Sequence, residues 1–478
     1  MRFNRVLLIT QPIFEGKNRN LMPTNPPASL GYLAETLKRK YIDYKIYDSY
    51  LYQNERPLMK QISRFRPDLI GISLYTYQYK GSYDLLRSIK RSFPNIQIVA
   101  GGPHLSVMRE GALKQCSAID YGAVLEGEET LLELCLGINI NQIEGLIHRV
   151  NGIPVYNGER PLITNLDQLP FPTFDKFELK RYTEKRIGII SSRGCPYSCG
   201  YCPVKLTMGH RFRARSSRSV TEEIHYWYER GYRHFSFLDD NFTLLPSRVY
   251  EVCELIREAG MKGLHFSLPN GVRADKVSLE LLREMQSVGF EEIAFGVEVG
   301  NDKMLQRIGK QENMKTIEKS ISQACSLGYR VILFFIIGYP GETWNDIEDS
   351  FQIAKKYPVF SVRFYNLIPF PGTQLYRLIQ EQGSFVESPE HFLNHASGID
   401  NEPTFQTPEL SLEERKKAFT EGGRIHREVL RRYLRHKFNN LGFCSEFLVR
   451  IVSSEVFLNA YWNNRVFRRL VARFKSHL

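Results

Sequence analysis

Three cysteines in one short loop have the spacing of a metal-binding motif. Cys195, Cys199 and Cys202 form the pattern CxxxCxxC within a stretch that also contains glycine and proline. Three thiolates so placed can bind three corners of an iron–sulfur cube, whereas a closed zinc site needs a fourth ligand. Because no fourth cysteine lies near these three in the sequence, one iron would keep an open position for a small molecule. The pattern therefore predicts chemistry at an iron–sulfur centre.

A zinc loop, or simply three packed thiols, is the alternative interpretation of this motif. Zinc would require a distant fourth ligand, for which Cys253, Cys325 and His210 are the candidates. The cysteines outside the motif are scattered without metal-ligand spacing and are expected to be buried core thiols. They are Cys116, Cys135, Cys253, Cys325 and Cys444.

Cysteine usage and hydropathy predict a cytoplasmic protein. The chain has eight cysteines in 478 residues and no recognisable signal peptide, which favours a reducing compartment over a disulfide framework. No apolar stretch reaches the roughly 18 residues of a membrane-spanning helix.

The net charge of +12 is concentrated near the C-terminus. Residues 431–478 contain ten Lys or Arg against Glu446 and Glu455, interleaved with aromatic and aliphatic side chains. A basic, aromatic helix is typical of contact with a membrane surface. A helix packed on the protein with a solvated face is the alternative. Nucleic-acid binding is not expected, because no recognised RNA-binding module accompanies the charge. The apolar members are Phe443, Phe447, Val449, Ile451, Phe457, Tyr461, Trp462, Phe467, Leu470 and Phe474.

Two α/β regions must position these residues. In residues 1–150, apolar strands alternate with amphipathic helices, which predicts a doubly wound parallel sheet with its ligand site at the carboxyl ends of the strands. A proline-rich segment, 151–185, is expected to be an extended linker. The expected strands are 6–10, 44–47, 69–74 and 96–100, and the expected helices are 28–40, 57–65 and 83–92.

In the second α/β region, 186–375, the alternation of strands and helices predicts a partial (β/α)6 barrel. Its active site is also expected at the carboxyl ends of the strands. Its first helix is expected to begin at a capping box, Ser219 to Glu222. A basic helical region, 376–478, is expected to follow. The predicted strands are 186–191, 234–238, 264–268, 291–297, 330–337 and 361–367. The first predicted helix ends at 231, and the others span 247–259, 278–288, 316–327 and 347–356.

The cysteine spacing, together with the aromatic Tyr201 before the third cysteine, resembles the radical S-adenosylmethionine enzymes, whose signature is CxxxCx(aromatic)C. The resemblance implies that Cys195, Cys199 and Cys202 hold a 4Fe-4S cluster. It also implies that S-adenosylmethionine chelates the fourth iron and is cleaved to a 5'-deoxyadenosyl radical.

Polar residues at the ends of the predicted barrel strands are the candidates for binding S-adenosylmethionine. Carboxylate and amide groups can accept from its ammonium group, and an arginine can pair with its carboxylate. Glu298 lies inside an apolar strand, where it needs a partner, and Arg273 is the candidate. Val299 stands where a small hydroxyl residue is common in the family, so a ribose contact there is not expected. The candidates are Tyr201, Asp239, Asp240, Asn241, Asn270, Arg273, Glu298 and Gly338.

The N-terminal region resembles the cobalamin-binding Rossmann-like domain that precedes the barrel in many radical S-adenosylmethionine enzymes. Two glycines would let the corrinoid's nucleotide tail approach the backbone. The loop 11–16 lacks the DxHxxG sequence, so we predict no histidine from that loop as the lower ligand of cobalt. A domain that has lost its cofactor is the alternative. The residues implied are Ser73, Thr76, Gly101, Gly102, Pro103, His104, Glu126 and Gly127.

These resemblances imply a radical enzyme that methylates an unactivated carbon, or a phosphorus, of a small-molecule or lipid substrate. An electron donor such as flavodoxin or ferredoxin would reduce the cluster. An oxidative cyclase is one alternative and a non-catalytic cobalamin carrier or regulator is another. Methylthiolation of tRNA is disfavoured, because it would need a second three-cysteine set, and only Cys116 and Cys135 occur in the N-terminal region.

Overall fold

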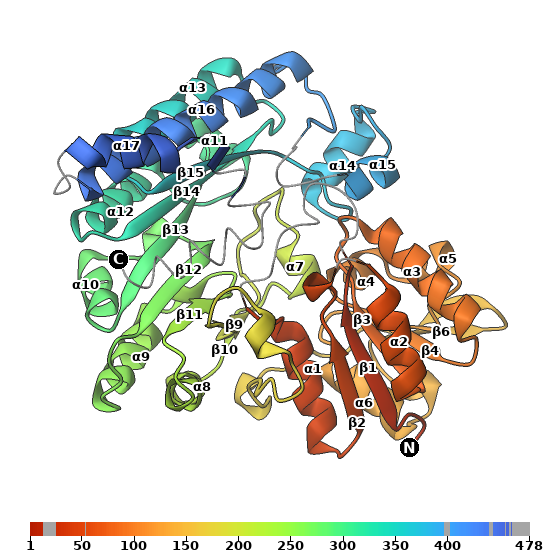
Figure 1. The fold of residues 1–478 in the computed structure, drawn as a ribbon. Coiled ribbons are helices and arrows are strands. Elements are labelled where there is room, and N and C mark those ends of the chain that lie inside the picture. Colours follow the sequence, from red (N-terminus) through yellow and green to blue (C-terminus); the bar gives the residue numbers. More distant parts are fainter. Residues whose placement is uncertain are drawn as a thin grey trace. The chain divides into compact units, whose positions relative to one another are not determined.

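The computed structural model describes residues 1–12, 25–52, 54–395, 402–438, 443–454, 456–457 and 460. The chain forms two compact units (Figure 1). The first comprises Met1–Lys185, Pro203–Ala214 and Pro389–Ser397, and the second comprises Arg186–Cys202, Arg215–Ser388 and Gly398–Leu478. Most of the predicted loop 11–16 and the aromatic tail after residue 460 lie outside the described residues. No helix in the described ranges is long and apolar enough to cross a membrane.

The first unit is built on a seven-stranded sheet in the order β2-β1-β3-β4-β5-β6-β7. Its first five strands pair in parallel, with the 2-1-3-4-5 order of doubly wound folds, and the last two are antiparallel additions. The predicted fold class is therefore confirmed for this unit. The strands are β1 (Arg5–Thr10), β2 (Asp43–Tyr47), β3 (Leu69–Ser73), β4 (Gln97–Gly101), β5 (Tyr121–Ala123), β6 (Leu146–Val150) and β7 (Ile153–Tyr156).

Apolar runs explain these strands. The side chains of Val6, Leu7, Leu8 and Ile9 in β1 are all buried, as expected of a strand covered on both faces. Amphipathic helices flank the sheet (Figure 1). They are α1 (Ala28–Arg39), α2 (Arg56–Phe65), α3 (Tyr79–Ser92), α4 (Pro103–Met108), α5 (Glu110–Gln115) and α6 (Glu128–Leu136), joined by α7 (Val204–Thr207) and α15 (Pro389–His395) from later in the chain.

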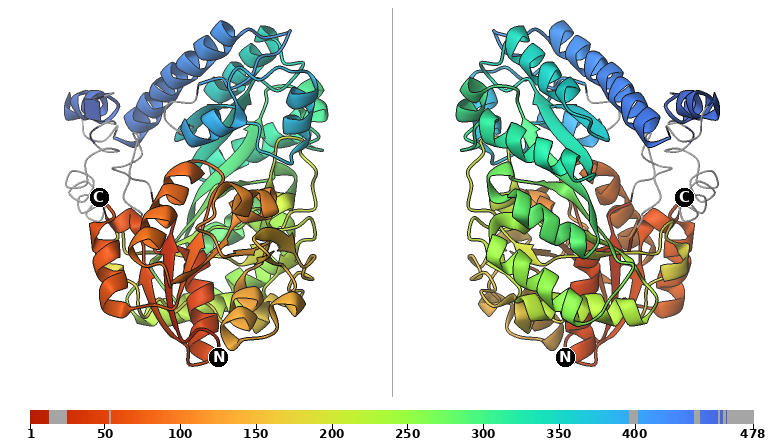
Figure 2. Two further views of the ribbon diagram at one scale, coloured as in Figure 1. Left: turned by 90° about the vertical axis from the view of Figure 1, so that its right-hand side faces the viewer. Right: turned by 90° about the vertical axis from the view of Figure 1, so that its left-hand side faces the viewer.

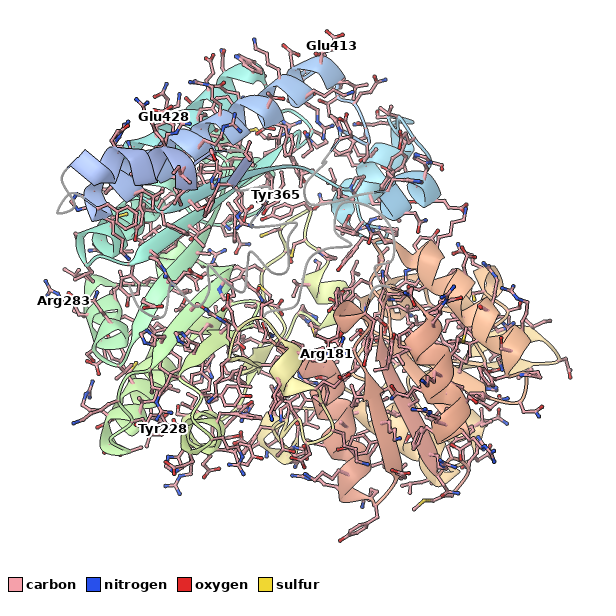
Figure 3. All side chains as sticks on the ribbon, viewed as in Figure 1. Arg181, Tyr228, Arg283, Tyr365, Glu413 and Glu428 are labelled. Carbon is pink, nitrogen blue, oxygen red and sulfur yellow. The ribbon has the colours of Figure 1, made fainter. Side chains whose placement is uncertain are left out.

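The segment 151–185 is tied to the first unit more closely than a linker. Its beginning forms β7, which pairs with β6 as the edge strand of the sheet. Near its end, the Arg181 guanidinium lies 4.2 Å from the centre of the Tyr52 ring and 2.9 Å from Glu178 (Arg181 is labelled in Figure 3). The first sheet therefore extends past the expected boundary at residue 150.

The second unit contains six parallel strands in chain order, β8-β11-β12-β13-β14-β15. Each strand places its carboxyl end at the same edge of the sheet, which confirms the predicted partial barrel. The strands are β8 (Arg186–Ile189), β11 (His234–Phe237), β12 (His265–Val272), β13 (Phe290–Glu298), β14 (Arg330–Ile337) and β15 (Ser361–Asn366), the last carrying Tyr365 of Figure 3.

The helices of this unit follow the predicted alternation, with one corrected start. The first helix is capped by Ser216, whose hydroxyl accepts from the backbone N–H of Ser219, so the expected capping box beginning at Ser219 is wrong. Ser216 is the better cap because it is extended, whereas Ser219 already lies within the helix. The helices are α8 (Ser217–Glu229), α9 (Pro246–Glu258), α10 (Leu279–Ser287), α11 (Asp302–Arg307), α12 (Met314–Ser326), α13 (Trp344–Lys356) and α14 (Gln374–Glu381).

The C-terminal region is helical, as expected, but its long helix is part of the barrel unit. Helix α16 (Leu412–Lys437) packs along β15 and α13 (Figure 2). A Cβ at Gly422 of α16 would lie 2.7 Å from the Phe364 ring, so the helix approaches the strand closely. Val449 of α17 (Phe443–Val452) is buried with Leu430 and Leu434. Helices α16 and α17 therefore pack on the protein in the described residues, and the membrane contact expected of the aromatic tail stays a prediction.

Candidate functional site

The cysteine loop leaves β8 and is held by its own backbone. Within the loop, the N–H of Cys202 donates to the carbonyl of Cys199 at 3.1 Å. Gly200 is fixed from two sides, because its N–H donates to Ile308 at 3.0 Å and its carbonyl accepts from Leu375 at 2.9 Å. A Cβ at Gly200 would touch the hydroxyl of Tyr339, so only glycine fits there. The loop therefore has a defined shape.

The three predicted cluster cysteines form no disulfide with a described residue and are partly exposed. Burial raises the pKa of Cys195 and of Cys199, while the positive charges of Lys310 and Arg273 act in the opposite direction. Within the described part of the chain, no three His, Cys, Asp or Glu side chains are arranged to hold a single metal ion. The donor set, three thiols with cations nearby, fits a cluster with net negative charge. Ligation by these three residues stays a prediction.

Asp239, which follows β11, supports the strand that leads into the cysteine loop. One carboxylate oxygen accepts from the N–H of Ser191 at 2.6 Å and of Ser192 at 3.1 Å. The other accepts from both hydroxyls, with Ser192 Oγ at 2.8 Å, and lies 3.8 Å from the Arg248 guanidinium. The side chain is 3% exposed. Its partners leave it a positioning residue rather than an open acceptor.

The next two residues remain available for a ligand. Asp240 is partly exposed, and burial, together with the charge of Asp239, raises its pKa to about 6, although the N–H of Gly194 acts against the shift. Asn241 is 2% exposed, and within the described residues neither its amide nitrogen nor its oxygen has a hydrogen-bond partner. A buried, unpaired amide is costly unless a ligand completes it. These residues fit the amino-acid end of S-adenosylmethionine.

Glu298 ends β13 and pairs with Lys310. Arg273 was its candidate partner from the sequence, and that pairing is not found among the described residues. Glu298 Oε1 lies 3.1 Å from Lys310 Nζ, and Glu312 lies 3.6 Å from the same ammonium. Burial acts to lower the pKa of Lys310, but the charges of Glu298 and Glu312 outweigh it and raise the pKa. The φ of Glu298 is +69°, a left-handed backbone that is uncommon for glutamate.

Tyr201 contacts this pair. Its hydroxyl hydrogen-bonds to Glu298, and burial followed by that carboxylate's charge raises the pKa of Tyr201 well above its usual value. Lys310 also lies close enough to Cys199 for each charge to influence the other group. The aromatic residue of the cysteine motif, the strand-end glutamate and a buried cation therefore form one cluster.

Arg273 has its own set of partners. It donates to Asp275 at 2.9 Å and to the carbonyl oxygens of Lys310 and Gln311, and it stacks over the Tyr197 ring at 3.6 Å. The arginine therefore contacts the cysteine loop through Tyr197, and it contacts the loop after α11 through the carbonyl oxygens of Lys310 and Gln311. Asn270 is exposed, and its amide nitrogen donates to the carbonyl of Leu238 at 2.8 Å.

Gly338 follows β14 and makes room for a side chain from α16. Its φ is +91°, and a Cβ there would collide with the guanidinium of Arg415. Arg415 is fully buried beside Glu342, whose carboxylate accepts from the Gly338 N–H at 2.5 Å. Burial raises the pKa of Glu342 to about 8 and lowers that of Arg415 to about 10. The glycine's conformation is thus required by packing.

The carboxyl edge of the first sheet brings together the predicted cobalamin residues of β3 and β4. Ser73 and Gly101 are direct neighbours in register, and the Leu74 N–H donates to the Gly101 carbonyl at 2.9 Å. Gly102 has φ +88°, and a Cβ there would lie 2.9 Å from the Leu74 carbonyl oxygen. Only glycine leaves this edge open, which fits the close backbone approach of a nucleotide tail. Thr76 is 5% exposed.

Two predicted residues of this edge face inward. His104, in α4 behind Pro103, is fully buried, stacks on Tyr79 and hydrogen-bonds to the Tyr83 hydroxyl at 2.7 Å. Burial lowers the pKa of His104 to about 4, so its neutral ring is a core residue. Glu126 receives two hydrogen bonds from Arg213, each 2.8 Å long.

Glu126 also accepts from the Ile163 N–H at 2.8 Å, which makes it part of a buried ion pair. Gly127, the N-cap of α6, is the remaining predicted residue of this loop. The side chains of His104 and Glu126 therefore stabilise the unit, while the loops that carry them remain candidates for binding cobalamin.

Comparison with known proteins agrees with both units. Residues 20–135 match the B12 binding domain family and residues 189–354 match the radical SAM superfamily. An uncharacterized methyltransferase from Pyrococcus horikoshii is 30% identical over 385 residues, covering 79% of this chain and 83% of the relative. The cytidylyl-2-hydroxyethylphosphonate methyltransferase of Streptomyces wedmorensis is 26% identical over 468 residues, covering 84% and 86%.

The radical S-adenosylmethionine methyltransferase TsrM from Kitasatospora setae, solved with cobalamin and a 4Fe-4S cluster, has the same fold. Its TM-score is 0.71 at 16% identity, with 99% of each chain covered. The two matched domains define a radical S-adenosylmethionine enzyme with a corrinoid domain. The chain belongs to the family of cobalamin-dependent radical S-adenosylmethionine enzymes.

Membership in this family confirms several predictions. The fold class, the enzyme class of radical S-adenosylmethionine methyltransferases and the three cofactors, a 4Fe-4S cluster, S-adenosylmethionine and cobalamin, are those expected. An inert barrel serving as a carrier or regulator is set aside. Sequence reasoning missed Lys310, Arg248 and Arg415, because each lies outside a strand-end motif or is brought in by a distant helix.

Proposed function

We propose that this chain transfers a methyl group to a carbon or phosphorus of a small-molecule or lipid substrate. The observation that carries the proposal is the juxtaposition at one sheet edge of a three-cysteine loop without disulfides, a partly exposed carboxylate and a buried amide that has no hydrogen-bond partner among the described residues. When bound, the cluster and S-adenosylmethionine supply a carbon-centred radical, and cobalamin supplies the methyl group. Relatives that act on a phosphonate and on hopanoids support both substrate classes.

The chain's own residues have distinct tasks in this proposal. Cys195, Cys199 and Cys202 hold the cluster, and Asp240 and Asn241 bind the amino-acid end of S-adenosylmethionine. Lys310 and Glu298 place a paired charge beside Cys199. An electron donor such as flavodoxin or ferredoxin reduces the cluster, and the basic C-terminal region contacts a membrane surface when the substrate is a lipid.

The test is anaerobic reconstitution of the full chain with iron and sulfide, followed by hydroxocobalamin, S-adenosylmethionine and a reductant. We expect release of both 5'-deoxyadenosine and S-adenosylhomocysteine, together with retained corrinoid. If the protein with its substrate released 5'-deoxyadenosine but no S-adenosylhomocysteine, an oxidative cyclase would be indicated instead. This second candidate has support from a 22% identical relative, the anaerobic magnesium-protoporphyrin IX monomethyl ester cyclase of Cereibacter sphaeroides.

A further inference from the structure

The twelve residues after the third cluster cysteine fold with the cobalamin-binding unit. Cys202 belongs to the barrel unit, and Pro203, joined to it by one peptide bond, begins the segment Pro203–Ala214 of the first unit. We call these residues the post-cysteine segment. The chain therefore passes from the predicted cluster site directly into the corrinoid domain.

One predicted cobalamin loop contacts the beginning of the post-cysteine segment. Helix α7, which starts two residues after Cys202, packs against α4. The N-cap of α4 is Gly102, the glycine whose backbone, without a Cβ, keeps the edge of the sheet open. A ligand bound to the Gly101–Gly102 backbone would thus contact the start of α4, the helix against which α7 packs.

The other predicted cobalamin loop holds the end of the segment. Glu126 follows β5, and both of its oxygens accept from Arg213, with exposures of 5% and 2% for the two side chains. Arg213 also donates to the carbonyls of Ile163 at 2.8 Å and Met208 at 3.0 Å, which closes the segment into a loop. A buried pair with this geometry fixes position strongly, because losing either partner leaves a charge unpaired.

We propose that the post-cysteine segment couples the two cofactor sites, with Arg213 as the positioning residue, so that cobalamin binding stabilises the iron–sulfur cluster. Ordering of the two cobalamin loops would restrain both ends of the segment, and the restraint reaches Cys202 through the backbone. Coupling between sites is reciprocal, so a bound cluster must tighten cobalamin by the same factor. The inference rests on the proposed positions of both cofactors.

The test measures each cofactor's binding with and without the other, on the full chain under anaerobic conditions. The dissociation constant of hydroxocobalamin is determined for iron-free and cluster-loaded protein, and the rate of iron loss to a ferrous chelator is measured with and without hydroxocobalamin. For the native chain we expect the cluster to tighten hydroxocobalamin binding at least about fivefold, the lower end of usual site-to-site coupling, and bound hydroxocobalamin to slow iron loss. Arg213→Ala should bring both ratios close to one while each cofactor still binds.

A control and a second variant keep the result interpretable. Arg149→Ala removes another arginine of the first unit, one that donates to the Leu113 carbonyl at 2.7 Å, and should leave both ratios unchanged. If Arg213→Ala does not fold, the double variant Glu126→Gln with Arg213→Met removes the charges together, which buried pairs tolerate better.

The possible failures are distinct. Native protein that binds both cofactors with ratios of one, or an Arg213 variant that retains the native ratios, overturns the coupling and leaves the proposed function intact. Native protein that binds no cluster or no cobalamin overturns the proposed function and the coupling with it.

Discussion

The two ligand edges of this protein are built from different chemistry. At the edge of the first sheet, Gly101, Gly102 and Ser73 are partly exposed, whereas the ionisable side chains, His104 and Glu126, are enclosed by structural partners. At the edge of the second sheet, some charges are enclosed and others stay open, so that Asp239 is satisfied while its neighbour Asp240 is partly exposed. In the proposed function, cobalamin would therefore contact mainly backbone, and the amino-acid end of S-adenosylmethionine would contact polar side chains.

The comparison also shows that two adjacent carboxylates can have different roles, one structural and one available to a ligand. Asp239 and Asp240 have the same chemistry and adjacent positions, yet only one has four hydrogen bonds from the cysteine-loop strand. Substitutions that separate support from ligand contact are therefore the most informative, and the following predictions are ordered by the size of the expected effect.

Loss of one predicted cluster ligand should abolish the chemistry of the second edge. We expect Cys199→Ala to reduce 5'-deoxyadenosine release by more than about a thousandfold, because residues that act as a unit fail together. Iron content and product release after reconstitution are the measurements. The matched control is Cys325→Ala, which removes a partly exposed thiol of α12 and should retain both. Equal iron content in the two variants would contradict the assignment.

The two adjacent aspartates should fail in different ways. Asp239→Asn places an amide donor against the N–H groups of Ser191 and Ser192, and we expect it to lower the free energy of unfolding by about 2–3 kcal/mol. Asp240→Asn should not lower the free energy of unfolding, because burial already disfavours the charged carboxylate, and it should weaken S-adenosylmethionine binding about tenfold. Denaturant unfolding and equilibrium dialysis separate the two effects, and identical profiles would show that the distinction is wrong.

Acidity provides a further test of Asp240. Its raised pKa of about 6 means that the carboxylate is charged above pH 6 and neutral below it. We therefore expect the affinity of the cluster-loaded enzyme for S-adenosylmethionine to fall as the pH drops from 7 to 5. The Asp240→Asn variant should lack this dependence between the same limits, and a variant with the native profile would assign the titration to another group.

Much of the scaffold could be predicted from the sequence because parallel strands buried on both faces appear as apolar runs. The strand predicted at 330–337 has those bounds in the structure. The edge strand β7 was missed because alternate residues of Ile153–Tyr156 are exposed and one is proline, which weakens the signal.

Within the site, sequence order identified the strand ends but not the pairing of charges. Glu298 was expected to pair with Arg273 on the neighbouring strand end, but Lys310, in the loop after α11, has the ammonium that reaches it. Arg415 reaches Gly338 only because α16 packs on the sheet. Such contacts depend on tertiary packing, and a single sequence carries no local pattern for them.

The open backbone of the first edge can be tested with two glycines that both have a positive φ. Gly102 and Gly152 have φ of +88° and +82°, so alanine is strained at either position, and more so at Gly102, whose ψ of −173° is a conformation almost restricted to glycine. Only at Gly102 would the new Cβ meet the Leu74 carbonyl, since Gly152 has open space around it. We expect Gly102→Ala to weaken hydroxocobalamin binding about tenfold, a loss of about 1.4 kcal/mol, while the iron content of cobalamin-free protein stays unchanged.

The Gly152→Ala protein should bind the corrinoid as the native chain does. Absorbance titration measures both variants. If the two alanines weaken binding equally, the effect comes from backbone strain in the unit, and the edge near Gly102 is not the cofactor's position.

The smallest expected effect on cofactor binding concerns the buried carboxyl of the second unit, whose titration acts on stability. The pKa of Glu342 is raised from 4.5 to about 8 by burial, so the folded protein binds a proton there that the unfolded chain has lost. Stability should therefore be fullest near pH 4.5 and decline as the pH rises towards 8, by at most about 1.4 kcal/mol per pH unit for one proton.

Glu342→Gln mimics the neutral acid and should flatten that decline, which urea unfolding at pH 5, 6, 7 and 8 can measure. The control Glu348→Gln changes an exposed glutamate of α13 and should keep the native slope. Burial favours the neutral form of Glu342 and the charge of Arg415 acts against it, so an unchanged slope in Glu342→Gln would mean that the arginine's charge holds Glu342 ionised. The contact between α16 and the end of β14 would then be an ion pair, and the second edge would have one more enclosed charge than the comparison assigns to it.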